Sequence, residues 1–188
     1  MKQIFVTILI IFTFQLFGQD TILQKTDGLA PIYQFKVLDI NGKEFDFGCL
    51  EGTKILIVNT ASKCMYGPQL YNLQKLYEKY KSNNFIVIAF PSNSFAKREP
   101  KDNADIAKKY KEKYGIEFPV MSKITARGDS INLVYDYLTN KFQNGINDKP
   151  VLWNFQKYLI DRNGYLSKII EPKVKPFDKE ITDWIEKE

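Results

Sequence analysis

Apolar runs and amphipathic segments alternate along the chain, and from Ile32 onward they predict a mixed α/β protein. Residues 54–59 form an apolar run typical of a strand covered on both faces, and residues 85–90 form another. Pro68 stands between them, where it can open a helix. Helically spaced residues follow it: Leu70, Leu73, Leu76, Tyr77 and Tyr80. A strand, a helix and a strand within about 37 residues form a βαβ unit, so the two strands should be parallel.

Two turn signals predict antiparallel hairpins near the two ends of this pattern. Asn41-Gly42 is a dipeptide that tight hairpin turns prefer, and Arg162-Asn163-Gly164 is a comparable signal. The paired strands are Tyr33–Leu38 and Glu44–Phe47 around the first turn, and Asn154–Asp161 and Tyr165–Ile170 around the second.

Three amphipathic segments predict further helices. The first spans residues 102–114, with Gly115 as its stop signal, and the second spans residues 130–141. The last begins near Pro176. The residues expected to face the core are Ile106, Tyr110 and Tyr114 in the first helix, and Ile181, Trp184 and Ile185 in the last.

The order of these elements indicates the fold class. A parallel βαβ unit followed by an antiparallel hairpin and a terminal helix is the thioredoxin topology. We therefore predict an α/β, thioredoxin-like fold with a central mixed sheet flanked by helices. It should have an extra N-terminal hairpin and an insertion at residues 92–151 between its two halves. A chain of 188 residues is the size of one domain once a leader is set aside, so residues 20–188 should form a single domain.

Residues 1–19 have the pattern of a secretory signal peptide. Lys2 precedes an apolar run over residues 4–14, and Gly18 lies near the end of the segment. A transmembrane helix needs about 20 apolar residues, so we expect cleavage of the leader and no stable membrane insertion afterwards. A retained anchor is the alternative. Export would place the protein in the periplasm or outside the cell.

Composition narrows the possible chemistry. The absence of histidine excludes Ser-His-Asp and Cys-His pairs, His-ligated haem and His-containing zinc sites. Two cysteines cannot form a four-thiolate site, and we expect no metal and no cofactor. The net charge is +5, but basic and acidic residues are interleaved as on solvated helix faces, without a recognised binding motif. We therefore expect no nucleic acid as a partner.

Cys64 is the residue best placed for chemistry. It follows the predicted strand at residues 54–59 and precedes the helix that Pro68 opens, a position where open α/β sheets bind ligands. Unpaired N–H groups at the helix start and the neighbouring Lys63 both favour a thiolate. An ordinary cysteine, with a pKa of about 8.5, is only about 3% thiolate at pH 7. The alternative is an inert, half-buried thiol.

Cys49 precedes the same strand, at the opposite end from Cys64. Six strand residues at about 3.3 Å each separate the two cysteines by roughly 20 Å, whereas a disulfide needs Cα atoms within about 7 Å. Cys49 should therefore not resolve an oxidised Cys64, and we interpret it as a core residue.

The sequence resembles the glutathione peroxidase family, in which a segment similar to residues 57–64 carries the peroxidatic Cys or selenocysteine. The resemblance covers nearly everything from Tyr33 to Ile185. Other matching stretches are residues 39–43, Pro68-Gln69, residues 90–95, Glu99-Pro100, residues 114–119, Trp153-Asn154-Phe155 and residues 158–164.

This resemblance implies a thiol peroxidase that protects against oxidative stress. In that reaction the Cys64 thiolate attacks hydrogen peroxide or an organic hydroperoxide and becomes a sulfenic acid, which an external small thiol or thioredoxin-like protein reduces. The resemblance also implies that the Trp153 indole N–H and the Asn154 amide N–H donate hydrogen bonds near the sulfur. Trp153 as an ordinary core aromatic is the alternative.

Three positions depart from the family pattern. The active-site Gln of the family falls at Ser94, whose shorter side chain would reach the site only through a water. A Thr that usually follows the catalytic Cys is replaced by Gly67. Members that use thioredoxin carry a resolving Cys where this chain has Tyr110, so the resemblance implies a one-Cys cycle.

Two other functions remain open. A thiol–disulfide oxidoreductase shares the fold, but that chemistry normally uses Cys-x-x-Cys, and Gly67 occupies the second position. A catalytically degenerate member could sense peroxide by oxidation of Cys64 or bind a partner, and the residues at Ser94 and Tyr110 favour this alternative.

Overall fold

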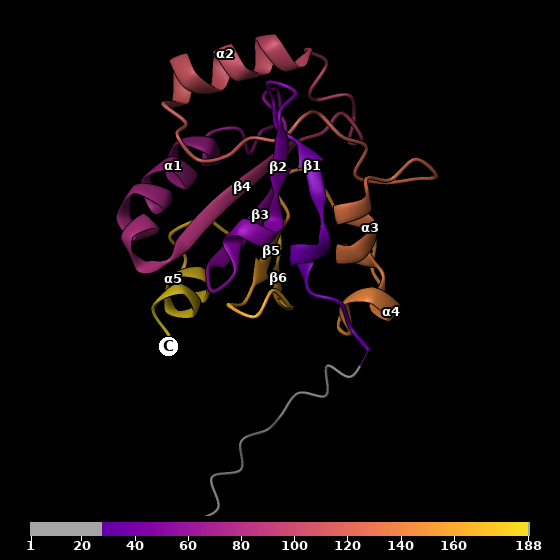
Figure 1. The fold of residues 1–188 in the computed structure, drawn as a ribbon. Coiled ribbons are helices and arrows are strands. Elements are labelled where there is room, and N and C mark those ends of the chain that lie inside the picture. Colours follow the sequence, from indigo (N-terminus) through magenta and orange to yellow (C-terminus); the bar gives the residue numbers. More distant parts are fainter. Residues whose placement is uncertain (1–27, 188) are drawn as a thin grey trace, which may run out of the picture.

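A computed structural model describes residues 28–187 (Figure 1). The signal peptide predicted at residues 1–19 lies outside the described residues. Within residues 28–187, no helix is long and apolar enough to cross a membrane.

The central sheet has four strands in the order β4-β3-β5-β6 (Figure 1). The strands are β3 (Lys54–Thr60), β4 (Phe85–Pro91), β5 (Lys157–Ile160) and β6 (Leu166–Ile170). β3 pairs with β4 in parallel, whereas β3–β5 and β5–β6 are antiparallel. The predicted mixed sheet and parallel βαβ unit are confirmed.

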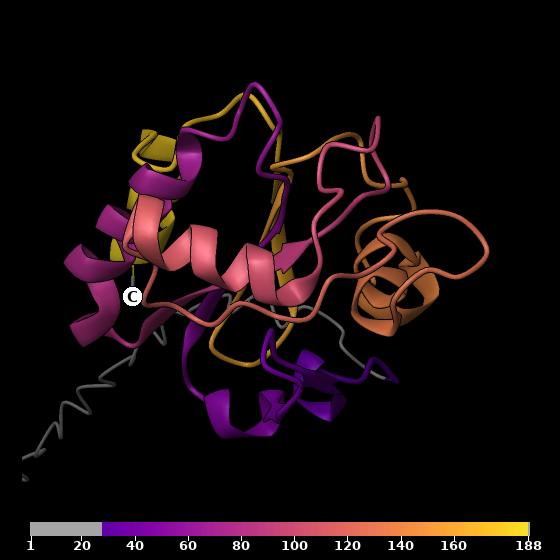
Figure 2. The same ribbon diagram turned by 90° about the horizontal axis from the view of Figure 1, so that it is seen from above.

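Helices cover both faces of this sheet, as Figure 2 shows. The helices are α1 (Gln69–Tyr80), α2 (Asn103–Tyr114), α3 (Leu133–Thr139), α4 (Lys141–Asn144) and α5 (Lys179–Glu186). Leu56 and Val58 of β3 pack in one buried cluster with residues of α1, α2 and α5. Ile55 and Ile57 point to the opposite face and pack with α3. Successive strand side chains alternate between faces, so the all-apolar run of β3 places core on both sides.

The N-terminal hairpin forms a separate two-stranded sheet of β1 (Lys36–Leu38) and β2 (Glu44–Asp46). Gly42 lies in its turn with φ +80°, a conformation that glycine adopts without steric cost. Short 3₁₀ turns complete the fold: η1 (Ile32–Gln34), η2 (Phe47–Leu50) and η3 (Lys81–Asn83).

Four predicted boundaries differ from the structure. β1 begins at Lys36 and not at Tyr33, because residues 32–34 form the 3₁₀ turn η1. The helix predicted at residues 130–141 is two short helices, because the backbone of Asn140 is extended. The Asn140 side chain accepts a hydrogen bond from the Phe142 N–H and caps the start of α4. β5 begins at Lys157 because residues 153–156 form a turn. The last helix begins at Lys179, where the Asp178 side chain accepts a hydrogen bond from the first turn.

Candidate active site

Cys64 lies in the loop between β3 and α1, at the carboxyl end of the strand as predicted. Its side chain is almost buried, and its backbone N–H donates to the carbonyl of Ala61 at 3.2 Å. It opens into a cavity of about 550 Å³. The other residues lining that cavity are Ser62, Gly67, Pro68, Tyr71, Asn72, Lys113 and Tyr114. A small molecule in this cavity can therefore reach a cysteine that protein atoms largely surround.

Gly67 fits closely against the Cys64 backbone. Its N–H donates to the Cys64 carbonyl at 2.8 Å, and a Cβ at this position would lie 3.0 Å from that carbonyl oxygen. A side chain here would crowd the turn that carries the sulfur, which accounts physically for glycine at this position.

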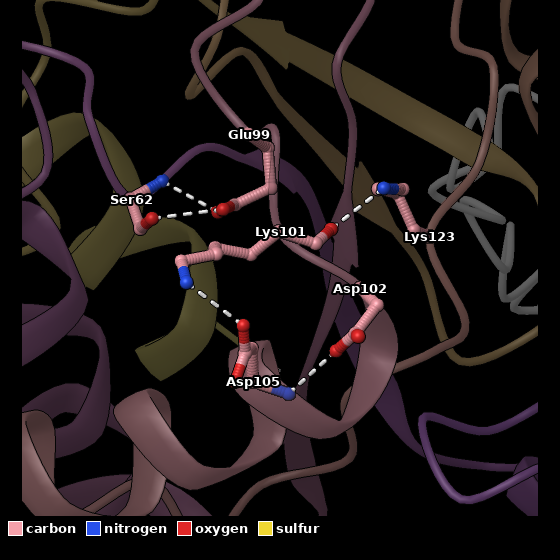
Figure 3. A network of polar contacts seen from close by, with 6 residues as sticks. All are labelled: Ser62, Glu99, Lys101, Asp102, Asp105 and Lys123. Carbon is pink, nitrogen blue, oxygen red and sulfur yellow. Dashed lines mark hydrogen bonds and ion pairs between the residues drawn. The ribbon is translucent and has the colours of Figure 1, made fainter.

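A buried carboxylate, Glu99, holds the loop before Cys64 (Figure 3). Glu99 accepts from the Ser62 N–H at 2.6 Å and from the Ser62 hydroxyl at 2.8 Å. The neighbouring Tyr110 hydroxyl donates to Thr60 Oγ1 at 2.9 Å. Burial raises the pKa of the Tyr110 phenol. Hydrogen bonds to a charged acceptor are worth about 1.5–3 kcal/mol each, so the loop is firmly anchored.

The residues after Glu99 are fixed in the same network (Figure 3). Lys123 Nζ donates to the Lys101 carbonyl at 2.6 Å, and Lys101 pairs with Asp105 at 2.9 Å. The Asp102 side chain accepts from the Asp105 N–H at 2.9 Å and caps α2. The sequence predicted Glu99 only as part of a family motif; its role as an anchor depends on a contact with a residue 37 positions away.

The turn at residues 153–155 lies beside the end of β3. Asn59 Nδ2 donates to the Trp153 carbonyl at 3.1 Å, and Phe155 N–H donates to the Asn59 carbonyl at 2.7 Å. Phe155 has φ +70°, a left-handed conformation that is rare and costly for an aromatic residue. Asn59 thus holds the peptide groups on both sides of Asn154 at the end of the strand that leads to Cys64.

Asn154 is fully buried, and neither polar atom of its side chain has a hydrogen-bond partner among the described residues. An unsatisfied buried polar group costs about 1–3 kcal/mol, so such a group indicates a functional position. Trp153 is 37% exposed, with its ring 5.7 Å from that of Phe95. This exposure does not fit the alternative of a core aromatic. The donor roles of Trp153 and Asn154 remain predictions.

Ser94 lines a different cavity, of about 630 Å³, together with Asn93, Lys123 and Arg127. Its hydroxyl oxygen accepts from Ala126 N–H at 3.0 Å and lies 3.0 Å from the Ser92 hydroxyl. Ser94 is therefore not among the residues that line the Cys64 cavity, and neither are Trp153 and Asn154.

The interpretation of Cys49 as a core residue is wrong. Cys49 lies in η2 and is exposed, whereas Phe47 of the same turn is fully buried. A 3₁₀ turn has three residues per turn, so Phe47 and Leu50 share the inner face and Cys49 points away from it. Both cysteines are free, and β3 separates them.

Within residues 28–187, no group of three or more Cys, Asp or Glu side chains is arranged to hold a metal ion.

Comparisons with known proteins show which family the chain resembles. The family described as Glutathione peroxidase matches residues 32–139. A "Glutathione peroxidase homolog BsaA" of Staphylococcus epidermidis is 41% identical over 159 residues, covering 85% of this chain and 99% of that protein. A "Glutathione peroxidase-like peroxiredoxin 2" of Saccharomyces cerevisiae is 37% identical over 160 residues, covering 84% and 99%.

Solved structures extend the comparison to the fold. The structure described as "Trgpx in apo form" superposes with a TM-score of 0.65 at 30% identity, covering 84% of this chain and 97% of that one. A thiol:disulfide interchange protein of the thioredoxin family from Chlorobium tepidum gives a TM-score of 0.59 at 21% identity, covering 84% and 93%, a likeness of fold alone. The fold is thioredoxin-like. The chain belongs to the glutathione peroxidase family and is a thiol peroxidase by that membership.

Proposed function

We propose that this protein reduces hydrogen peroxide or organic hydroperoxides through Cys64. The thiolate sulfur attacks one peroxide oxygen, the O–O bond breaks, and the other oxygen leaves as water or an alcohol after taking up a proton. The sulfur is oxidised to a sulfenic acid. The observation that carries the proposal is the position of Cys64, which lines a cavity just after the carboxyl end of β3. The same strand end binds the turn that holds Asn154, whose buried amide has no partner among the described residues.

Hydrogen-bond donors near the sulfur would stabilise the thiolate and the charge that grows on the leaving oxygen. We assign these roles to the Trp153 indole N–H and the Asn154 amide N–H. Ser94 is the third candidate, but its side chain lines a different cavity from the one that Cys64 lines.

We propose a one-Cys cycle for the return to the thiol. One external thiol attacks the sulfenic acid and forms a mixed disulfide with Cys64, while the displaced hydroxide takes up a proton and leaves as water. A second external thiol then attacks the mixed disulfide, which frees Cys64 as the thiol and joins the two external thiols in a disulfide. Two features support an external reductant. Cys49 is exposed at the end of β3 opposite to Cys64. A buried tyrosine, Tyr110, stands at the position of the family's resolving cysteine. A small thiol and a thioredoxin-like protein both fit this scheme.

The cysteine variants test the proposal. Purified protein with a dithiol reductant should consume hydrogen peroxide or an organic hydroperoxide. Cys64→Ser should abolish turnover, and Cys49→Ser should leave it unchanged. Peroxide consumption that survives Cys64→Ser, or its absence from the wild type with both small thiols and thioredoxin, contradicts the proposal.

A peroxide sensor is the second candidate, and the placement of Ser94 favours it. If no side chain replaces the family's Gln near the sulfur, oxidation could be slow and stoichiometric. Repeated turnover under excess reductant distinguishes the two: an enzyme consumes many equivalents of peroxide, whereas a sensor stops at one.

We also propose export of the mature protein, where it would protect against oxidative stress outside the cytoplasm. The support is the apolar run at residues 4–14 after Lys2. N-terminal sequencing of protein recovered from the native cell should give a start near residue 19. A start at Met1 contradicts cleavage and favours a retained anchor.

A further inference from the structure

Lys157, the first residue of β5, is fully buried and donates to three backbone carbonyls. Its Nζ lies 2.8 Å from the carbonyl oxygen of Phe155, 2.9 Å from that of Val174 and 3.4 Å from that of Pro172. An ammonium group has three N–H donors and no acceptor, so three carbonyls use its full capacity. Burial lowers the pKa of Lys157 to about 7, because the charged form loses its hydration.

These bonds connect the two segments that carry the proposed site. Phe155 directly follows Asn154, the residue with the unpartnered amide. The Pro172 carbonyl also accepts from Gln69 Nε2 at 2.8 Å, and Gln69 is the first residue of the helix that follows Cys64. The ammonium group and the Pro172 carbonyl therefore form a bridge between the Asn154 turn and the start of α1.

A second buried lysine offers a comparison within the same sheet. Lys54, the first residue of β3, is 6% exposed and also donates to three carbonyls. They belong to Trp184, at 2.9 Å, Ile185, at 3.1 Å, and Lys187. These carbonyls end α5, at the end of β3 away from Cys64. The two lysines share burial and the kind of partner. They differ in position, because Lys157 pairs with Val58 near the carboxyl end of β3, whereas Lys54 begins β3 at its amino end.

We propose that Lys157 is a positioning residue for the peroxide reaction. By holding the Phe155 carbonyl and, through Pro172, the start of α1, it fixes Asn154 relative to Cys64. This inference rests on the proposed function. Lys54 makes the same kind of contact only for stability.

The test compares Lys157→Met with Lys54→Met, since methionine keeps the unbranched chain as far as the fourth side-chain atom but removes the N–H donors. Both variants should have a lower melting temperature. The rate constant for oxidation of Cys64 by hydrogen peroxide in a single turnover should fall tenfold or more in Lys157→Met and stay within twofold of the wild type in Lys54→Met. Equal rate constants in the two variants overturn the positioning role.

A second readout does not depend on peroxide. The chain has two tryptophans, so a Trp184→Phe background leaves Trp153 as the only fluorophore of this kind. Lys157→Met should shift the Trp153 emission maximum, and Lys54→Met should not. An emission maximum unmoved by Lys157→Met overturns the inference, whereas a wild type that does not react with peroxide overturns the proposed function instead.

Gln69→Leu tests the same bridge if Lys157→Met does not fold. It removes one hydrogen bond to Pro172, and the Gln69 Oε1 atom that it also removes has no partner among the described residues. We expect the peroxide rate constant to fall severalfold with little change in melting temperature. A rate constant equal to that of the wild type overturns the bridge.

Discussion

The two ends of strand β3 differ in whether nearby buried polar atoms have hydrogen-bond partners. At the amino end, the Lys54 ammonium is bonded to carbonyls that end α5, and Arg162 Nη1 donates to the Gly52 carbonyl at 3.0 Å. At the carboxyl end, one side-chain atom of Asn59, one of Gln69 and both of Asn154 are buried without hydrogen-bond partners among residues 28–187. The other two such atoms among the described residues are the hydroxyls of Tyr135 and Tyr137 in α3. A buried polar atom without a partner needs an explanation, and a functional role is one of them.

The two cysteines follow the same division. Cys49 lies exposed at the amino end, whereas Cys64 lies almost buried at the carboxyl end, in a loop that Glu99 anchors. The proposed role of Cys64 therefore attributes reactivity to the surroundings of a thiol and not to its exposure. Four changes test this comparison, in order of decreasing expected effect.

Asn154→Leu should produce the largest change, in rate and not in stability. Removing a donor to developing negative charge costs about a hundredfold to a thousandfold in rate. The free energy of unfolding should not decrease, because this amide has no partner to lose. Stopped-flow oxidation of Cys64 and chemical denaturation measure the two quantities.

Asn147→Leu is the matched control for Asn154→Leu. Asn147 is a buried amide that donates to the Leu138 carbonyl at 2.8 Å, outside the Cys64 cavity. It should lose about 2 kcal/mol of stability and keep a rate constant within twofold of the wild type. The comparison fails if Asn154→Leu reacts as fast as Asn147→Leu.

Glu99→Gln should lower stability by about 2 kcal/mol, because two hydrogen bonds to Ser62 lose their charged acceptor. Oxidation of Cys64 should also slow as the loop loosens. Glu44→Gln is the control, since Glu44 forms only an exposed ion pair with Lys36 at 3.2 Å, worth less than about 1 kcal/mol. Equal unfolding free energies for the two variants would show that Glu99 is not an anchor.

The pH dependence of stability should report Lys157. Its folded pKa of about 7 lies below the ordinary value of 10.5, so between these values the unfolded chain binds a proton that the folded protein does not. Stability therefore rises with pH in this range, by at most about 1.4 kcal/mol per pH unit. Below pH 7 both states bind the proton, so Lys157 contributes no slope there. The slope should be smaller in Lys157→Met by this contribution. Identical slopes in urea unfolding between pH 7 and 9 contradict a buried, titrating lysine.

Cys49→Ser should have the smallest effect. An exposed side chain away from special contacts changes stability by less than about 0.5 kcal/mol. Alkylation with iodoacetamide followed by peptide mass spectrometry should show Cys49 labelled in the folded protein whether or not peroxide is present. Loss of Cys49 labelling at the same peroxide dose that oxidises Cys64 would contradict the division between the two ends.

Local patterns were sufficient to predict much of the fold. The apolar runs of β3 and β4, the spacing in α1 and the turn signals all depend on neighbours in sequence, and so does the placement of Cys64 after a strand. The break at Asn140 was missed because a capping side chain within a helical pattern has no signal in apolar spacing. Cys49 was misplaced because the sequence gives no sign of the 3₁₀ turn that exposes it.

The site itself depends on contacts between distant segments. The bonds from Glu99 to Ser62, from Asn59 to Trp153 and from Lys157 to Val174 join segments that the fold brings together. Spacing along the chain does not encode such pairs. The resemblance to the family pointed to Trp153, Asn154 and Ser94, but the cavity that Ser94 lines becomes known only from the structure.

The most direct test treats reduced protein with one equivalent of hydrogen peroxide in the presence of dimedone, a reagent that traps sulfenic acids. Mass spectrometry of the peptides should find the adduct on Cys64 and none on Cys49. Dimedone on Cys49 alone, or on neither cysteine while the peroxide persists, contradicts the assignment of Cys64 as the residue that attacks peroxide.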